Sequence, residues 1–227
     1  MLTQTMTRRA IPQPQAAQRQ VPAASHALTG QIELMGATMP FTRNAEIYGE
    51  NERAEYLYKL LSGSVRTYKV LNDGRRQIGA FYLPGDLFGL EVGENHTLSA
   101  EAIIDCKVLV IKRSSLIGLA MRDPEIARKL WTTTACELQR AQDHIMLLIK
   151  TARERVAGFL LEMSARSAAA TEVDLPMSRQ DIADYLGLTI ETVSRTLTQL
   201  ENAATIAVPT SRRIVLRNRG ALSRLNS

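Results

Sequence analysis

The chain has 227 residues, of which 45% are hydrophobic and 22% are charged, and its formal net charge is +5. These values predict one large folded domain or two ordinary ones and exclude a chain that is disordered throughout. Apolar runs fall far short of the ~20 residues of a membrane-spanning helix, no secretion signal is evident, and two cysteines cannot form a disulfide framework. We therefore expect a cytoplasmic protein with no membrane association.

Residues 1–27 are rich in Gln, Pro and Ala, show no apolar periodicity and are expected to form a flexible arm. Between residues 28 and 122, short apolar runs alternate with turn signals such as Asn72-Asp73-Gly74. The runs cover residues 56–61, 65–71, 78–83, 99–104 and 108–111. Because no long helical pattern separates them, they predict an antiparallel β domain, a roll or a barrel.

A long helix is predicted over residues 123–151, because Asp123 can cap it and Pro124 suits its first turn. Apolar or small side chains follow at helical spacing. They are Ile126, Leu130, Thr134, Leu138, Ala141, Ile145 and Leu148. This stripe could cover the core of its own domain, but its length of more than three heptads favours the seam of a homodimer.

Residues 152–227 show the pattern of a helix-turn-helix module that follows an amphipathic helix near residues 155–163. Ser178 can cap one helix in a capping box with Asp181, and Gly187 permits a sharp turn after it. Thr189 can then cap the next helix, which is predicted over residues 190–202. This second helix is in the position of a DNA recognition helix.

The second helix divides into an apolar face and a polar face. The apolar face carries Val193, Leu197 and Leu200. The polar face carries Glu191, Ser194, Arg195 and Thr198. Arg195 can donate two hydrogen bonds to guanine, and Glu191 can accept one from cytosine. The alternative is a Glu191–Arg195 pair on a solvated helix, which has the same spacing.

After this helix, two short β runs at residues 206–208 and 214–216 flank a basic turn. They predict a wing whose Ser211, Arg212 and Arg213 could contact DNA phosphates. All ten basic residues between 151 and 227 are Arg, the side chain suited to bidentate contacts with guanine and phosphate.

In this order, the β domain, long helix and winged module resemble the Crp/Fnr regulators. The segments 178–195 and 209–214 are similar to the FixK branch, the rhizobial regulators of low-oxygen and nitrogen-fixation genes. The resemblance implies an α+β fold with an N-terminal antiparallel β-roll like that of cyclic-nucleotide-binding domains, a long dimerisation helix and a C-terminal winged helix-turn-helix. It implies that bases of a TTGA-type half-site are read by Ile190, Glu191, Ser194 and Arg195. Candidate phosphate contacts are Ser178, Arg179, Thr189, Thr192, Ser211, Arg212 and Arg213.

Three departures from the family pattern bear on regulation. The N-terminal cysteines that hold an iron–sulfur cluster in Fnr proteins are missing. Leu90 and Leu98 occupy the positions of the acid and the arginine that bind cyclic nucleotides, so no cofactor is expected. Ser178 replaces a cysteine typical of close FixK relatives, which removes a thiol redox switch and indicates a natural variant or an engineered oxidation-resistant form.

The resulting hypothesis is a homodimeric transcription activator that binds a palindromic promoter site, contacts RNA polymerase and needs no effector. Enzyme activity is not indicated, because neither metal-ligand spacing nor a nucleophile motif is found. A sensor gated by haem or another small ligand stays open as an alternative, with His96 as a candidate ligand, although a lone histidine in a polar loop is more typical of a solvated side chain. A module that binds only proteins would show no DNA binding.

Overall fold

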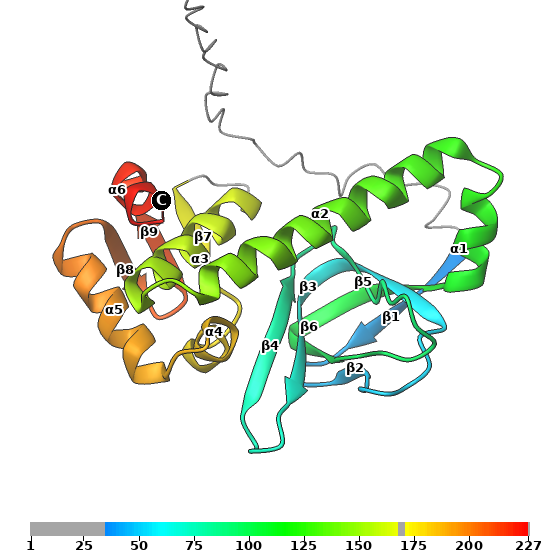
Figure 1. The fold of residues 1–227 in the computed structure, drawn as a ribbon, viewed down its shortest axis with the longest axis horizontal. Coiled ribbons are helices and arrows are strands. Elements are labelled where there is room, and N and C mark those ends of the chain that lie inside the picture. Colours follow the sequence, from blue (N-terminus) through cyan, green and yellow to red (C-terminus); the bar gives the residue numbers. More distant parts are fainter. Residues whose placement is uncertain (1–34, 168–170, 227) are drawn as a thin grey trace, which may run out of the picture.

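The computed structural model describes residues 35–167 and 171–226. Figure 1 shows two lobes joined by the long helix α2 (Pro124–Leu148): a β lobe beneath the helix and a C-terminal lobe beyond its end. The α+β architecture predicted from the sequence is confirmed. The predicted arm of residues 1–27 lies outside the described residues.

The β lobe is one antiparallel sheet in the order β1-β6-β3-β4, with β2 paired to β6 and β5 paired to β3. Its strands are β1 (Gly36–Phe41), β2 (Glu46–Tyr48), β3 (Tyr56–Val70), β4 (Arg76–Tyr82), β5 (Leu87–Phe88) and β6 (Ser99–Lys112). The predicted runs 56–61 and 65–71 form the single strand β3, and 99–104 and 108–111 form the single strand β6. The predicted break after residue 61 is therefore wrong.

Gly63 explains why β3 can continue through this point. The strand pairing shifts register between Leu60 and Val65, where the sheet bends. Gly63 adopts a φ of +89°, and a Cβ there would lie 2.5 Å from the carbonyl oxygen of Asp105. Only glycine fits such a bend without strain.

Helix α2 begins as predicted, because the Asp123 carboxylate accepts a hydrogen bond from the Glu125 N–H at 2.9 Å. It ends at Leu148 instead of 151, because Thr151 caps the next helix, α3 (Ala152–Arg166), through a bond from its N–H to Glu154 at 2.8 Å. The short helix α1 (Arg113–Ala120) was not predicted.

The C-terminal lobe contains α3, the helix-turn-helix pair and a three-stranded wing in the order β7-β9-β8. Its other elements are β7 (Glu172–Asp174), α4 (Arg179–Leu186), α5 (Ile190–Asn202), β8 (Ile206–Thr210), β9 (Arg213–Leu216) and α6 (Arg219–Leu225). The predicted helices and wing are confirmed, whereas α6 was not predicted. Among the described helices, none is long and apolar enough to cross a bilayer.

The two lobes share part of their hydrophobic core. Ile78 and Phe81 of β4 belong to the same buried cluster as Phe159 of α3 and Tyr185 of α4. The ring centroids of Phe81 and Tyr185 lie 5.0 Å apart. The helix-turn-helix is therefore packed directly against the β lobe as well as connected to it by α2.

Candidate nucleic-acid interface

The helix-turn-helix is fixed by side-chain caps on both helices. Ser178 Oγ accepts from the Asp181 N–H at 3.1 Å, and the Asp181 carboxylate accepts from the Ser178 N–H at 2.9 Å. Gly187 ends α4 with a φ of +61°, and Thr189 Oγ1 accepts from the Thr192 N–H at 3.2 Å. These contacts confirm the predicted capping box, turn and second cap, and they set where α5 begins.

Helix α5 has the two faces that its sequence predicted. Val193, Leu197 and Leu200 are at most 2% exposed and pack into the lobe. The polar face is exposed to solvent and contains Glu191, Ser194, Arg195 and Thr198. Ile190, at the start of the helix, is 38% exposed. The polar face thus lies open along the first turns, where a recognition helix contacts bases.

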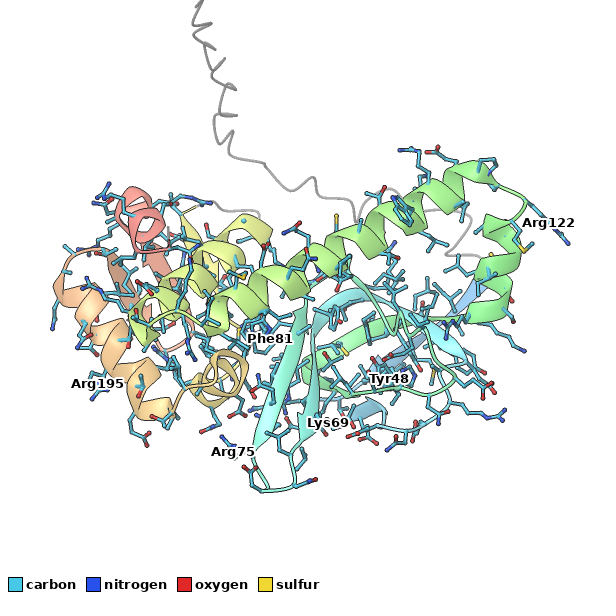
Figure 2. The ribbon with its side chains drawn as sticks, viewed as in Figure 1. Tyr48, Lys69, Arg75, Phe81, Arg122 and Arg195 are labelled. Carbon is cyan, nitrogen blue, oxygen red and sulfur yellow. The ribbon has the colours of Figure 1, made fainter. Side chains whose placement is uncertain are left out.

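Arg195 projects from the outer surface of the lobe (Figure 2). Within the described residues its guanidinium has neither a hydrogen bond nor an ion pair, and the alternative pairing with Glu191 is not formed. Hydrogen bonds from the backbone and from Thr189 hold the pKa of Glu191 below its usual value, so this side chain is a charged acceptor. One unpaired donor and one charged acceptor therefore stand side by side on the exposed face.

The wing brings Ser211, Arg212 and Arg213 to the turn between β8 and β9, where all three are exposed. The Arg213 guanidinium bonds to the Glu172 carboxylate of β7. The Arg212 side chain has no partner in the described part of the chain; its backbone N–H donates to Thr210 and its carbonyl oxygen accepts from the Leu175 N–H. The two arginines therefore differ in how much positive charge they offer a phosphate.

The other candidate phosphate contacts gather at the N-termini of α4 and α5. Ser178 Oγ lies 2.8 Å from Asp181 Oδ2, and the hydroxyls of Thr189 and Thr192 lie 3.1 Å apart. Arg179 opens α4, and burial lowers the pKa of its guanidinium. Helix N-termini attract phosphate through their free N–H groups, so this placement suits backbone contacts.

An apolar stripe runs along the exposed side of α2. Trp131 is 76% exposed, Leu138 60% and Ile145 62%, at steps of one heptad. Of the predicted seam, Thr134, Leu138, Ala141 and Ile145 are exposed, and Leu148 is half-buried. The structure corrects the prediction that Ile126 belongs to the exposed stripe. Ile126 is buried with Leu116 in the core of its own lobe, because the first turn of α2 packs against α1. Leu130 packs against the same core, and Trp131 was missed.

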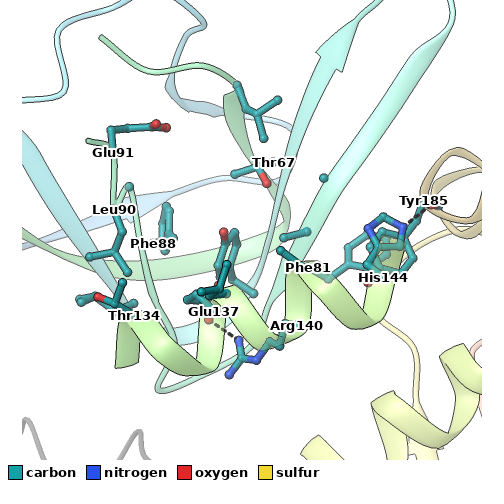
Figure 3. Close-up of a pocket in the computed structure, with 18 of the residues that line it drawn as sticks. Thr67, Phe81, Phe88, Leu90, Glu91, Thr134, Glu137, Arg140, His144 and Tyr185 are labelled. Carbon is teal, nitrogen blue, oxygen red and sulfur yellow. Dashed lines mark hydrogen bonds and ion pairs between the residues drawn. The ribbon is translucent and has the colours of Figure 1, made fainter. Parts of the chain in front are cut away.

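A cavity of about 370 Å³ lies between the β lobe, α2 and the C-terminal lobe (Figure 3). Its apolar walls include Phe81, Phe88, Leu90 and Leu98. The two leucines are those that the family resemblance places at phosphate-binding positions, and both line the cavity as expected.

The arginines of this cavity are already neutralised by protein carboxylates. Arg140 lies 2.6 Å from Glu137 and 3.2 Å from Asp86, and Arg166 lies 2.6 Å from Asp86. Burial lowers the pKa of His144, so it adds no charge near neutral pH, and Glu91 lines the opposite side. A phosphate group in this cavity would therefore meet no unpaired cation among the residues that line it.

The structure also corrects the predicted environment of His96. It is 1% exposed, and its ring stacks on Tyr48 with centroids 3.6 Å apart, so the expectation of a solvated side chain is wrong. Neither ring nitrogen has a hydrogen-bond partner within the described residues. His96 does not line the cavity, which leaves it poorly placed to ligate a haem there.

Sequence reasoning also missed the ion pairs between the lobes. Arg66 of β3 bonds to Asp181 of α4, and Arg76 of β4 bonds to Asp181 and Asp184. Arg66 and Asp181 are 115 positions apart, so no local pattern could have indicated the contact.

Comparison with known proteins agrees with this arrangement. Residues 38–123 match the family described as the cyclic nucleotide-binding domain, and residues 154–225 match the Crp-like helix-turn-helix domain. The nitrogen fixation regulation protein FixK of Azorhizobium caulinodans is 54% identical over 86% of this chain and 82% of its own length. FixK of Rhizobium meliloti is 40% identical over 79% and 82%.

A solved structure is also similar. FixK2 from Bradyrhizobium japonicum is 56% identical, with a TM-score of 0.81 over 85% of this chain and 98% of that chain. The similarity spans both lobes and the helix between them. The chain therefore belongs to the Crp/Fnr family of transcription regulators, within its FixK branch.

Proposed function

We propose that this protein is a homodimeric activator of low-oxygen and nitrogen-fixation genes that binds a TTGA-type inverted repeat without cyclic nucleotide or iron–sulfur cluster. The observation that carries the proposal is the exposed polar face of α5, where the Arg195 guanidinium has no partner in the described part of the chain. The names of the FixK relatives support nitrogen-fixation genes as targets. Activation implies that the bound protein contacts RNA polymerase.

In this proposal each half-site is read by Ile190, Glu191, Ser194 and Arg195. Arg195 donates to guanine O6 and N7, Glu191 accepts from a cytosine amine, and Ile190 contacts a thymine methyl. Phosphates are held by the N-termini of α4 and α5 and by the wing. Arg212 contributes more than Arg213, since the latter is paired with Glu172.

The second copy that completes the dimer covers the apolar stripe of α2. Exposed apolar side chains at heptad spacing are typical of a coiled-coil seam, and an inverted repeat requires two recognition helices about one duplex turn (~34 Å) apart. In the proposed organisation, the β lobe is followed by a dimerisation helix, α2 (Pro124–Leu148), and by a DNA-binding domain that begins at α3 (Ala152–Arg166).

Independence from an effector is supported by the cavity between the lobes. Its arginines are paired within the protein, and the lobes already share a core around Phe81 and Tyr185. No ligand is needed to bring these elements together.

A regulator gated by a small neutral ligand is the alternative, and the cavity of about 370 Å³ is the observation that favours it. Such a ligand would have to bind without a strong anionic group. Mixing the purified protein with haem and looking for a Soret band tests the haem version, and an absent band discards it.

The proposal is tested by fluorescence anisotropy of the ligand-free protein on a TTGA…TCAA palindrome and on a scrambled duplex. The salt should be about 0.15 M, because electrostatic, sequence-independent binding is weaker there than at low salt. Specific proteins bind their sites at least about a thousandfold more tightly than other DNA, and such a preference is expected here. Equal affinity for both duplexes would contradict the proposal.

A further inference from the structure

The strand pair β3–β4 of the β lobe reaches α4, the first helix of the helix-turn-helix, with two arginines. Arg66 Nη1 lies 3.0 Å from Asp181 Oδ1, and Arg76 Nη2 lies 2.6 Å from the same oxygen. Arg76 Nε also donates to Asp184 Oδ2 at 2.9 Å. We call these four residues the interlobe clamp.

The clamp is enclosed at its centre. The Asp181 side chain is 4% exposed and that of Arg66 is 9% exposed. Arg66 Nη2 lies 2.6 Å from Glu101 Oε1 of β6. The Arg66 guanidinium therefore contacts one carboxylate of its own lobe and one of α4. Separating the lobes would break both ion pairs of Asp181 and leave Glu101 as the carboxylate paired with Arg66, and the loss of these enclosed pairs resists movement of α4.

Asp181 connects the clamp to the end of α4 nearest the predicted DNA contacts. Its Oδ1 binds the two arginines, while its Oδ2 accepts from the backbone N–H and the hydroxyl of Ser178. The same carboxylate therefore closes the capping box and anchors the helix to the β lobe. Because α5 packs on α4 across a turn of three residues (187–189), a shift of α4 also shifts α5.

Further contacts continue this interface along α4. Gln77 Nε2 donates to the Tyr185 carbonyl oxygen at 3.3 Å, and a ring nitrogen of His144 lies 2.8 Å from the same oxygen. The Arg76 guanidinium lies 5.8 Å from the Tyr68 ring centroid. One side of α4 thus contacts both the β lobe and α2.

We propose that Arg66 and Arg76 are positioning residues for DNA reading, which hold the helix-turn-helix at a fixed orientation and so set the half-site spacing that the dimer accepts. This inference rests on the function proposed above. Neither arginine contacts DNA in this scheme. They act through Asp181 and Asp184 on the orientation of α5.

The experiment compares operators with different spacers, because spacing preference reports orientation and not overall stability. Affinities are measured for the TTGA…TCAA palindrome, for versions with one base pair added or removed between the half-sites, and for a single half-site. The proteins are the unaltered chain, Arg66→Gln, Arg76→Gln, Asp184→Asn and the double variant of Arg76 and Asp184. Arg75→Gln is the matched control, since Arg75 lies at the hairpin tip (Figure 2), is 78% exposed and pairs only with Asp73 within the described residues.

We expect the unaltered chain and Arg75→Gln to prefer one spacing by about tenfold or more, and Arg66→Gln and Arg76→Gln each to prefer it by less than about threefold. Binding to the single half-site should stay within about twofold in all proteins, because the base-reading residues are unchanged. Asp184→Asn should reduce the preference as Arg76→Gln does, and the double variant should add little, as for residues that act as a pair.

If Arg66→Gln and Arg76→Gln both keep the full spacing preference, the clamp has no positioning role. If all affinities fall in equal proportion, single half-site included, the arginine is only a stabilising contact and the inference is also wrong. If the unaltered chain shows no preference for the palindrome over scrambled DNA, the proposed function fails first and the clamp proposal fails with it.

Discussion

The junction between the lobes and the surface expected to face DNA both depend on arginine, but they use it in opposite ways. At the junction, Arg66, Arg76, Arg140 and Arg166 each contact a carboxylate. On the outer surface, Arg195 has no such contact among the described residues. A buried charge must be paired, whereas an exposed guanidinium stays solvated at little cost. The partners of an arginine therefore indicate how much of its charge is available to DNA: Arg195 is unpaired among the described residues, Arg213 of the wing is paired with Glu172, and the junction arginines are paired within the protein.

The largest expected effect comes from the apolar stripe of α2, because it affects both lobes at once. Leu138→Asp places two like charges in the proposed seam, which costs several kcal/mol. The dimer should dissociate in light-scattering measurements, and affinity for the palindrome should fall about a hundredfold or more. Met39→Asp is the control, since Met39 is also an exposed apolar side chain but lies on β1. A Leu138→Asp protein that stays dimeric would show that the seam lies elsewhere.

The second largest expected effect comes from removing the Arg195 side chain of α5. Arg195→Ala should cost about 1–3 kcal/mol of binding and relax discrimination at the half-site guanine. Anisotropy titrations on duplexes with each base at that position measure both effects. Thr198→Ala is a useful comparison, because its side chain is on the same face but its hydroxyl donates to the Ser194 carbonyl at 3.1 Å. If Arg195→Ala leaves sequence preference unchanged, the recognition-helix assignment is wrong.

A smaller effect separates the two arginines of the wing. Arg212→Ala should weaken binding to all sequences alike and reduce the slope of log affinity against log salt by about 1. Arg213→Ala should change the slope less, because its charge is already shared with Glu172. Salt titrations of both variants on the palindrome and on scrambled DNA test this order. A larger slope change for Arg213 would reverse it.

The smallest expected effect concerns pH and the junction. Burial lowers the pKa of His144, against the opposing influence of its bond to the Tyr185 carbonyl and of Glu162. A histidine with a lowered pKa stabilises the folded state fully above its unfolded value of about 6.5, and this stabilisation is lost as pH falls through the folded value.

The free energy of unfolding should therefore decrease between pH 7 and pH 5, and His144→Gln should lessen the decrease. For one histidine the slope is at most about 1.4 kcal/mol per pH unit. The comparison with the variant is needed because burial raises the pKa of Glu137 in the same region, which acts in the opposite direction. Identical pH curves for the two proteins would contradict the assignment.

The C-terminal lobe was the easier part to predict because its signals are local. Ser178 and Asp181, or Val193 and Leu197, lie within one or two turns of each other, so capping chemistry and helical spacing indicate their roles directly. Once the apolar side chains of α5 are assigned to the core, the polar side chains on its opposite side are expected to be exposed. The short helix α1 has no side-chain cap and was missed, and α6 was missed although Asn218 caps it.

The junction could not be predicted, because its contacts join residues that are far apart in the chain. The clamp depends on how β4 packs against α4, and His96 is buried because a loop brings it onto Tyr48. Ile126 has the spacing of a seam residue, but its burial depends on the packing of α1, which sequence periodicity does not reveal. Tertiary packing decided each of these positions.

In the proposed function, the DNA-reading arrangement forms without a small molecule. The most direct test is to unfold the purified protein in denaturant, remove all small molecules by dialysis, refold it and measure its affinity for the palindrome beside that of untreated protein. We expect equal affinities and an equal preference over scrambled DNA. Refolded protein that is dimeric and folded but binds only after a low-molecular-mass cell extract is added would contradict it.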